Sequence, residues 1–191
     1  MENVKKIIQA SIETKQQVLQ NEELLKTICD VVNVIVAAFK NGHRVYFCGN
    51  GGSAADAQHL AAEFSGRFYI DRPALPAEAL HCNTSYLTAV ANDYSYDMIY
   101  ARLLQGIGNK GDVLIGLSTS GNSKNIIKAF EVAKHKEMIT IGFTGTTGGA
   151  MKDISDLLIN VPSSDTPRIQ ECHMLIGHII CQLVEENLFK A

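Results

Sequence analysis

The chain has 191 residues, enough for a single domain with a substantial hydrophobic core. Its composition is typical of a soluble globular protein, with 46% hydrophobic and 19% charged residues, and a formal net charge of −3 without a basic run gives no reason to expect a nucleic-acid partner. The longest apolar run, residues 31–39, is too short to cross a membrane and the N-terminus lacks the apolar core of a secretory signal, so we expect a cytoplasmic protein without a membrane partner.

The first 40 residues are predicted to be helical, because apolar side chains recur at helical spacing in two stretches separated by a polar Gln-Asn pair. Gly42 is expected to close the second helix. The period then changes, and residues 44–48 are predicted to form a strand that enters a glycine-rich turn. A helix over residues 53–66 is expected to follow this turn directly.

The rest of the chain alternates between the two patterns. We expect strands at 77–80, 112–117, 138–143 and 157–161, and helices at 85–91, 96–107, 123–136 and 166–188. The pair Asn92 and Asp93 is expected to separate the first two of these helices. Strands that alternate with helices predict an α/β domain in which a parallel sheet of about five strands lies under helices on both faces.

The first glycine turn, residues 49–54, formally fits the dinucleotide fingerprint G-x-G-x-x-A between a strand and a helix. That fingerprint requires a carboxylate near the end of the next strand, where this chain has Leu80, His81 and Cys82. We therefore expect no nucleotide cofactor, and the turn must hold another ligand.

The second turn, between the strand at 112–117 and the following helix, carries four hydroxyl side chains: Ser118, Thr119, Ser120 and Ser123. The N-terminus of a helix offers free N–H groups and a positive dipole end, which suit a phosphate. The alternative is a serine N-cap in a solvated loop, but one hydroxyl would suffice for capping. Because no Gly-Lys-Ser/Thr sequence follows, the phosphate is expected to be a handle on the substrate and not a transferred group.

Four polar residues lie within otherwise apolar helical stretches. His59 and Glu63 are four residues apart and therefore share a helix face; as an isolated pair they could equally be a surface ion pair. Gln170 and His178 interrupt the apolar terminal helix, where a single histidine is more often a hydrogen-bonded core residue. A carboxylate on a buried helix is costly unless it acts on a ligand or binds a metal.

Five segments together resemble the sugar isomerase (SIS) domain family, and within it the phosphoheptose isomerases: CGNGGSAADAQH, AAEFSGRF, ANDYSYD, LSTSGNSKN and RIQECHMLIGH. The resemblance runs from the first strand to the last helix. It implies a flavodoxin-like, five-stranded parallel sheet flanked by helices and preceded by a helical segment. It also implies a single SIS domain over residues 1–191, in which residues 1–41 pack in a homotetramer and 42–191 form the α/β core.

The activity implied by the resemblance is aldose–ketose isomerisation of D-sedoheptulose 7-phosphate to D-glycero-D-manno-heptose 7-phosphate through an enediol. This reaction is the first step toward nucleotide-activated heptose for bacterial surface polysaccharides such as lipopolysaccharide. Two alternatives stay open: a non-catalytic SIS-domain tetramer that binds a replication initiator protein, and an SIS enzyme that acts on another sugar phosphate. The intact polar set on the two helices favours an enzyme.

The same resemblance implies roles for individual residues. One zinc ion per subunit would be bound by His59, Glu63, Gln170 and His178, and Glu63 and His178 would act as base and acid. Substrate contacts are expected from Asn50, Gly51, Gly52, Glu63, Asn92, Asp93, Ser118, Thr119, Ser120, Ser123 and Gln170.

Geometry limits this ligand set, because Gln170 and His178 are eight residues apart, or about 12 Å along a helix. Loose or exchangeable metal coordination is therefore expected. Arg67 and Cys172 receive no role, and five scattered cysteines without a CxxC pair argue against a disulfide framework or a thiolate zinc site.

Overall fold

The structure, a computed structural model, describes residues 1–190; residue 191, the last of the expected domain, lies outside the described residues. Five parallel strands form one sheet in the order β2-β1-β3-β4-β5. The strands are β1 (Val45–Gly49), β2 (Ala77–Ala79), β3 (Val113–Leu117), β4 (Ile139–Thr144) and β5 (Leu157–Asn160). The predicted α/β class is thus confirmed.

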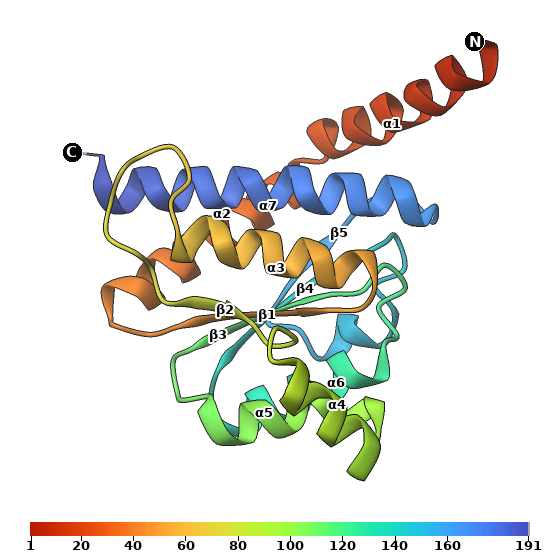
Figure 1. The fold of residues 1–191 in the computed structure, drawn as a ribbon. Helices are drawn as coiled ribbons and strands as arrows, with labels where there is room; N and C mark the ends of the chain where they lie inside the picture. The colour runs from red at the N-terminus through yellow and green to blue at the C-terminus, as the bar shows by residue number, and fades with distance from the viewer. Residues whose placement is uncertain (191) are drawn as a thin grey trace.

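Helices cover both faces of this sheet (Figure 1). They are α1 (Glu2–Gln20), α2 (Glu22–Lys40), α3 (Gly52–Ser65), α4 (Thr84–Asp93), α5 (Ile99–Ile107), α6 (Lys124–His135) and α7 (Thr166–Phe189), with short 3₁₀ turns η1 (Tyr96–Met98) and η2 (Gly149–Asp153). None of the helices within residues 1–190 combines the length and apolar character that crossing a membrane requires.

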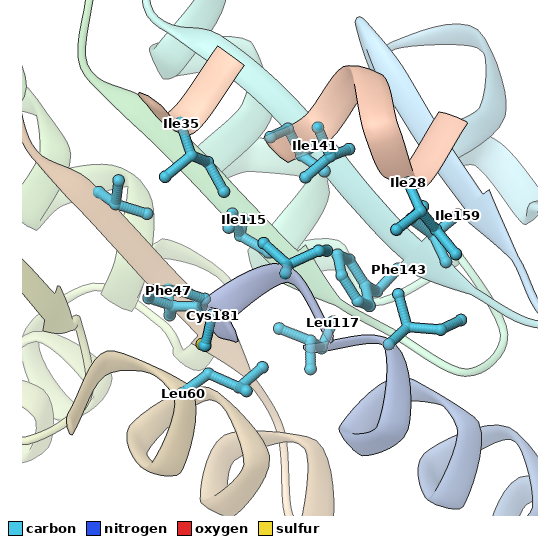
Figure 2. Packing of buried hydrophobic residues seen from close by; sticks show 14 of the residues in the cluster. Ile28, Ile35, Phe47, Leu60, Ile115, Leu117, Ile141, Phe143, Ile159 and Cys181 are labelled. Atoms are coloured by element: carbon cyan, nitrogen blue, oxygen red, sulfur yellow. The ribbon is translucent and has the colours of Figure 1, made fainter. Parts of the chain in front are cut away.

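The sheet separates two hydrophobic cores. Helices α2, α3 and α7 supply the core on one face, and α4, α5 and α6 supply the core on the other. Figure 2 shows the first core, where side chains of α2, α3 and α7 meet strand residues that include Phe47, Ile115, Ile141 and Phe143. Every residue of β1 and β3 is buried, which explains why these strands appear in the sequence as continuous apolar runs.

The observed boundaries depart from expectation in one instructive place. Asn92 and Asp93 do not separate two helices but form the last residues of α4, whose hydrogen bonding continues through Tyr94 N–H to the Val90 carbonyl. The break follows at Tyr94 and Ser95, before η1. Helix formation therefore persists through two residues of poor helix propensity, directly after Val90, the buried residue of α4.

Helix α1 has little cover from the rest of the chain. Only Thr14 and Val18 are buried in it, whereas four apolar residues that predicted the helix are 44–58% exposed: Val4, Ile7, Ile8 and Ile12. It is attached through hydrogen bonds from Ser11 and Lys15 to Glu171 of α7, and Val18 near its end joins the hydrophobic core. In Figure 1 this helix projects from the body of the molecule.

The strand order places a topological switch point between β1 and β3. The chain leaves β1 into α3 on one face of the sheet, and leaves β3 into α6 on the other face. In open parallel sheets such a divergence creates a crevice at the carboxyl ends of the two strands. Both turns singled out in the sequence lie at this crevice.

Candidate active site

The turn from β1 into α3 depends on glycine. Gly51 has φ +56° and ψ −121°, a conformation that side chains disfavour. Gly49 lies against the Ser53 backbone, where a Cβ would collide, and its carbonyl accepts a hydrogen bond from the Tyr100 hydroxyl. The turn is therefore tight enough to aim the first N–H groups of α3 at the crevice.

The turn from β3 into α6 keeps its hydroxyl groups together. Ser118 Oγ lies 2.9 Å from Ser123 Oγ, and Asn122 N–H donates to Ser120 Oγ at 3.2 Å. Ser123 occupies the N-cap of α6 without a side-chain capping bond, so its hydroxyl is not used in the way that the N-cap alternative requires. Gly121, at φ +68°, lies against the Gly148 backbone, which keeps this turn close to the loop after β4.

Helices α3 and α7 bring three of the predicted residues together. Glu63 Oε1 lies 2.9 Å from His59 Nε2, and His59 Nε2 lies 3.5 Å from His178 Nε2. The side chain of His59 is 51% exposed and that of Glu63 is 21% exposed, so the group is reachable from solvent. The Phe68 ring packs beside His178, with ring centroids 5.7 Å apart.

Close packing of the two helices makes this meeting possible. A Cβ on Gly177 of α7 would lie 2.5 Å from Leu60 Cδ2 of α3, closer than side chains tolerate. Because residue 177 is glycine, α7 approaches α3 at the level where the next residue, His178, faces His59.

The group fits a metal ion. Donor atoms of His59, Glu63 and His178 all lie within 4.8 Å of one another. Two nitrogens bound tetrahedrally to zinc at about 2.0–2.1 Å lie about 3.3 Å apart, close to the observed 3.5 Å between the two imidazole nitrogens. Two imidazoles and a carboxylate form a donor set that suits zinc and related transition metals.

Gln170 does not lie in this group. Its Nε2 donates to Ser53 Oγ at 3.3 Å, and a Cβ on Gly52 would lie 2.7 Å from the same nitrogen. Gln170 therefore contacts the first turn of α3, whereas His59 follows about two turns later. Its expected role as a metal ligand stays a prediction that requires its side chain to leave Ser53.

Asp56, three residues before His59, is an acidic residue that sequence reasoning missed. The Oδ2 atom of Asp56 is buried without a hydrogen-bond partner among the described residues. Burial raises the pKa of Asp56, and the nearby His59 opposes the shift. Its i, i+3 spacing from His59 was the available signal.

The remaining predicted sugar contacts lie in different settings. Asn92 and Asp93 are exposed at the end of α4, where Asn92 Nδ2 donates to Asp93 Oδ1 at 3.0 Å. Asn50 lies in the crevice, and its amide pairs with the amide of Asn125, a buried residue of α6 that sequence reasoning also missed. No local spacing signals this pair, since 75 positions separate its members.

A buried ion pair holds the segment that follows α3. Glu185 of α7 accepts hydrogen bonds from the backbone N–H groups of residues 68–70 and from Arg72 Nε. Arg72 in turn donates to the carbonyls of Glu63 and Phe64, and both charged side chains are 2% exposed. The ion pair thus fixes the C-terminal end of α3, which carries Glu63, against α7.

Arg67 and Cys172, which have no assigned role, lie in opposite environments, one exposed and one buried. Arg67 is exposed, and its one side-chain hydrogen bond within residues 1–190 goes to the Phe68 carbonyl at 3.5 Å. Cys172 is fully buried, and burial raises the pKa of its thiol, as it does for Cys48 and Cys181. These three thiols are therefore protonated core residues.

Comparisons with known proteins show which family this chain belongs to. A family model described as SIS domain matches residues 6–145. A phosphoheptose isomerase from Aneurinibacillus thermoaerophilus is 54% identical over 98% of this chain and 94% of its own, and phosphoheptose isomerase 2 of Campylobacter jejuni is 54% identical over 99% and 96%.

Solved structures give the same result. A phosphoheptose isomerase from Francisella tularensis superposes with a TM-score of 0.93 at 34% identity, covering 97% of each chain. One from Neisseria gonorrhoeae superposes with a TM-score of 0.91 at 39% identity, covering 97% of this chain and 98% of that one. The chain belongs to the SIS domain family and, within it, to the phosphoheptose isomerases.

Proposed function

We propose that the chain is an aldose–ketose isomerase that converts D-sedoheptulose 7-phosphate to D-glycero-D-manno-heptose 7-phosphate through an enediol, at the start of nucleotide-activated heptose synthesis. The observation that carries the proposal is the His59–Glu63–His178 group, two of whose members lie on the helix that begins at the first of the two turns at the switch point. Relatives named phosphoheptose isomerase, 54% identical over nearly the full length, support the choice of substrate.

The reaction needs one base and one proton shuttle. Glu63 removes a proton from C1 of the ketose, while His178 gives a proton to O2, so that an enediol forms. Glu63 then returns the proton to C2, and His178 accepts the proton from O1 as the C1 carbonyl forms. The proton taken from carbon returns to the neighbouring carbon, and the product is an isomer of the substrate with no other reagent consumed.

The Glu63 carboxylate is aimed by its surroundings. His59 lies 2.9 Å from one of its oxygens, and the Arg72 guanidinium holds its backbone carbonyl at 2.8 Å. A side chain fixed at both ends loses little further freedom when it meets C1, which favours proton transfer.

We further propose that His59, Glu63 and His178 hold zinc, one ion per subunit, with Gln170 as the predicted fourth ligand. The donor set and the 3.5 Å separation of the imidazole nitrogens support this choice. Bound zinc would supply Lewis-acid polarisation of the substrate carbonyl. Glu63 cannot be a tight ligand and a free base at the same instant, so we expect its metal contact to be exchangeable.

The phosphate of the substrate is proposed to bind at the turn after β3, through Ser118, Thr119, Ser120 and Ser123 and the N-terminus of α6. The paired Ser118 and Ser123 hydroxyls support this role, because both can rotate to donate to phosphate oxygens. The sugar chain is proposed to contact Asn50, Gly51, Gly52 and Gln170, with hydroxyl contacts from Asn92 and Asp93.

We expect a cytoplasmic homotetramer formed from single SIS domains, in which residues 1–41 pack between subunits and residues 42–191 form the α/β core. The exposed apolar stripe of α1 supports this arrangement, since such a stripe on a soluble protein marks an interaction surface.

The decisive test is NMR of purified protein with sedoheptulose 7-phosphate. We expect the signals of the ketose to be replaced by those of the aldose 7-phosphate. Absence of turnover by protein that is folded and loaded with zinc would overturn the proposed function.

Removal of metal tests the zinc proposal separately. Dialysis against a chelator should lower both the activity and the melting temperature, because a ligand that binds only the folded state stabilises it. Elemental analysis that finds no bound zinc, together with unchanged activity after chelation, would contradict it.

A further inference from the structure

A buried ion pair links the two helices that carry the His59–Glu63–His178 group, and it supplies no donor atom to that group. Arg72 Nε donates to Glu185 Oε1 at 3.1 Å, and each of the two side chains is 2% exposed. In Figure 1 the loop that follows α3, to which Arg72 belongs, passes beside the C-terminal end of α7, which carries Glu185. We call Arg72 and Glu185 the anchor pair.

Stability alone does not account for the anchor pair. Removing two charges from water is costly, and apolar residues of similar volume can often replace a buried ion pair without loss of stability. Apolar side chains could not supply the hydrogen bonds that this pair makes to the main chain. Glu185 accepts from the N–H groups of residues 68–70 at 2.7–3.1 Å, and Arg72 donates to the carbonyls of Glu63 and Phe64 at 2.8 and 2.7 Å. The anchor pair therefore fixes the main chain of residues at the candidate site.

Glu63 lies where a helix is held least well by its own hydrogen bonds. Helix α3 ends at Ser65, and the Glu63 carbonyl is one of its last four, which lack partners within a helix. Helix ends fray, so such a residue moves unless another group holds it. Within residues 1–190 the Arg72 guanidinium is the hydrogen-bond partner of this carbonyl. Arg72 thus holds the main chain from which the Glu63 carboxylate reaches His59 Nε2 at 2.9 Å.

The anchor pair also acts on His178, through Phe68. Glu185 accepts from the Phe68 N–H at 3.1 Å, and the Phe68 ring packs beside the His178 imidazole. A histidine that binds a metal usually has its other ring nitrogen hydrogen-bonded, which fixes the orientation of the ring. Within residues 1–190 the His178 ring has one hydrogen-bond partner, His59. Its rotation is therefore restricted by packing against Phe68.

We propose that Arg72 is a positioning residue whose contacts hold Glu63 and His178 at the spacing that binds a metal ion. This inference rests on the zinc site of the proposed function. Ligands that are already held in place lose less conformational freedom when the ion binds, so the affinity of the site is higher. Loosening the anchor pair should therefore weaken metal binding although every ligand is still present.

The test measures the zinc affinity of metal-free protein by competition with a chromophoric chelator, at a temperature at which every variant is folded. Arg72→Lys keeps a positive charge beside Glu185, but a single ammonium cannot bond to the carboxylate and to two carbonyls as the guanidinium fork does. The affinity for zinc should fall about tenfold, the low end of the effect of removing a group that supports a metal ligand. The visible absorption of bound Co²⁺, which depends on the arrangement of its ligands, should change as well.

The control is Leu104→Ala, which removes a fully buried side chain of α5 from the core on the other face of the sheet. It should lower the melting temperature, while the zinc affinity and the Co²⁺ spectrum stay as in the wild type. If Arg72→Lys does not fold, Glu185→Gln decides the question in the same assay, because it removes the charge of the partner and leaves Arg72 in place.

The outcomes separate the two proposals. Wild-type protein that binds neither zinc nor Co²⁺ would overturn the proposed metal site and this inference with it. Zinc binding by the wild type, together with unaltered affinity in folded Arg72→Lys or an equal fall in Leu104→Ala, would overturn only the inference.

Discussion

Glu63 carries two proposed duties, as metal ligand and as base, and its surroundings accommodate both. Its carboxylate is only 21% exposed, and donor atoms of His59 and His178 lie within 4.8 Å of it. One oxygen can face an imidazole or an ion while the other faces substrate, because a carboxylate has about four acceptor positions.

The substitution Glu63→Gln tests the role of Glu63 as base and should leave the fold intact. The amide has the same shape but cannot accept a proton, so turnover of sedoheptulose 7-phosphate should fall about 10²- to 10⁴-fold. The NMR assay measures the loss, and size-exclusion chromatography should show an unchanged assembly. The control is Glu186→Gln on α7, which alters an exposed contact with Lys190 and should keep full activity. Retained turnover in Glu63→Gln would exclude Glu63 as the base.

His173 affects stability and not chemistry. It is fully buried on α7, and burial lowers its pKa to about 4, although a hydrogen bond to the Thr144 carbonyl opposes the shift. Well above pH 6.5 the residue is neutral in both the folded and the unfolded chain, so it does not change the free energy of unfolding with pH. As the pH falls toward 4, only the unfolded chain takes up the proton, so stability declines.

Denaturant unfolding between pH 7 and pH 4 tests this behaviour. The His173 contribution should lower the free energy of unfolding by about 3 kcal/mol over this range, as linkage predicts for the depressed pKa. The slope of the free energy of unfolding against pH reports how many more protons the unfolded chain binds than the folded one. This number should be smaller by up to one in His173→Gln and unaltered in the exposed control His135→Gln. Equal slopes in all three proteins would show that His173 is not buried as a neutral ring.

Among the elements, the segment between α3 and β2 is held by one side chain of α7, Glu185. The carboxylate of Glu185 satisfies three consecutive backbone N–H groups and also pairs with Arg72. Despite the cost of burial, these hydrogen bonds lower the pKa of Glu185, so the stability it provides is present at neutral pH and declines as its carboxylate is protonated in acid.

Glu185→Gln should lower the free energy of unfolding by about 3 kcal/mol, because it leaves the buried Arg72 charge without its partner. The adjacent control Glu186→Gln should change stability by about 0.5 kcal/mol or less, as exposed pairs do. Chemical denaturation at neutral pH measures both. Equal stabilities for the two variants would contradict the role given to Glu185.

Sequence patterns located the elements well because most of them follow from local periodicity. The continuous apolar runs gave β1 and β3, and the turn residues gave the starts of α3 and α6. The break before η1 was placed two residues early, since a helix ends where its hydrogen bonding ends and not where propensity weakens. Strand β2 begins at Ala77 as predicted and ends at Ala79, one residue before the predicted end, because so short a strand offers too few residues to define a period of two.

The candidate site was less accessible to such reasoning. The spacing of His59 and Glu63 placed them on one face, but the approach of His178 depends on the packing of two helices more than 100 residues apart in sequence. Asn125 and Glu185 act through partners 75 and 113–117 positions away, which no local pattern reports. The family resemblance supplied His178 and Gln170, and it did not supply Asn125 or Glu185.

At the scale of the whole molecule, α1 has an apolar surface that the rest of the described chain leaves exposed. Its apolar stripe, which includes Ile7 and Ile8, is exposed to 54–58% at these two positions. We expect the double substitution Ile7→Ser/Ile8→Ser to shift the proposed tetramer toward smaller species, because the stripe loses apolar area that a partner would cover.

Light scattering coupled to size-exclusion chromatography measures this shift. The control Gln9→Ser, on a polar position of the same helix, should keep the native mass. Circular dichroism should show that both variants retain their helices. A native mass for the double variant would exclude the stripe from the subunit interface.

Gly177 connects the packing of the molecule to its chemistry. A hydrogen atom in place of a side chain lets α7 approach Leu60, and the imidazole of the next residue then stands 3.5 Å from its counterpart on α3. One added methyl group at residue 177 would push α7 away from α3 and increase the distance between the His59 and His178 nitrogens. The distance between the two imidazoles, and with it the fit to an ion, therefore depends on residue 177 having no side chain, because a methyl group there would meet Leu60 Cδ1 and Cδ2 at 2.5–2.6 Å and force Leu60 or α7 to move.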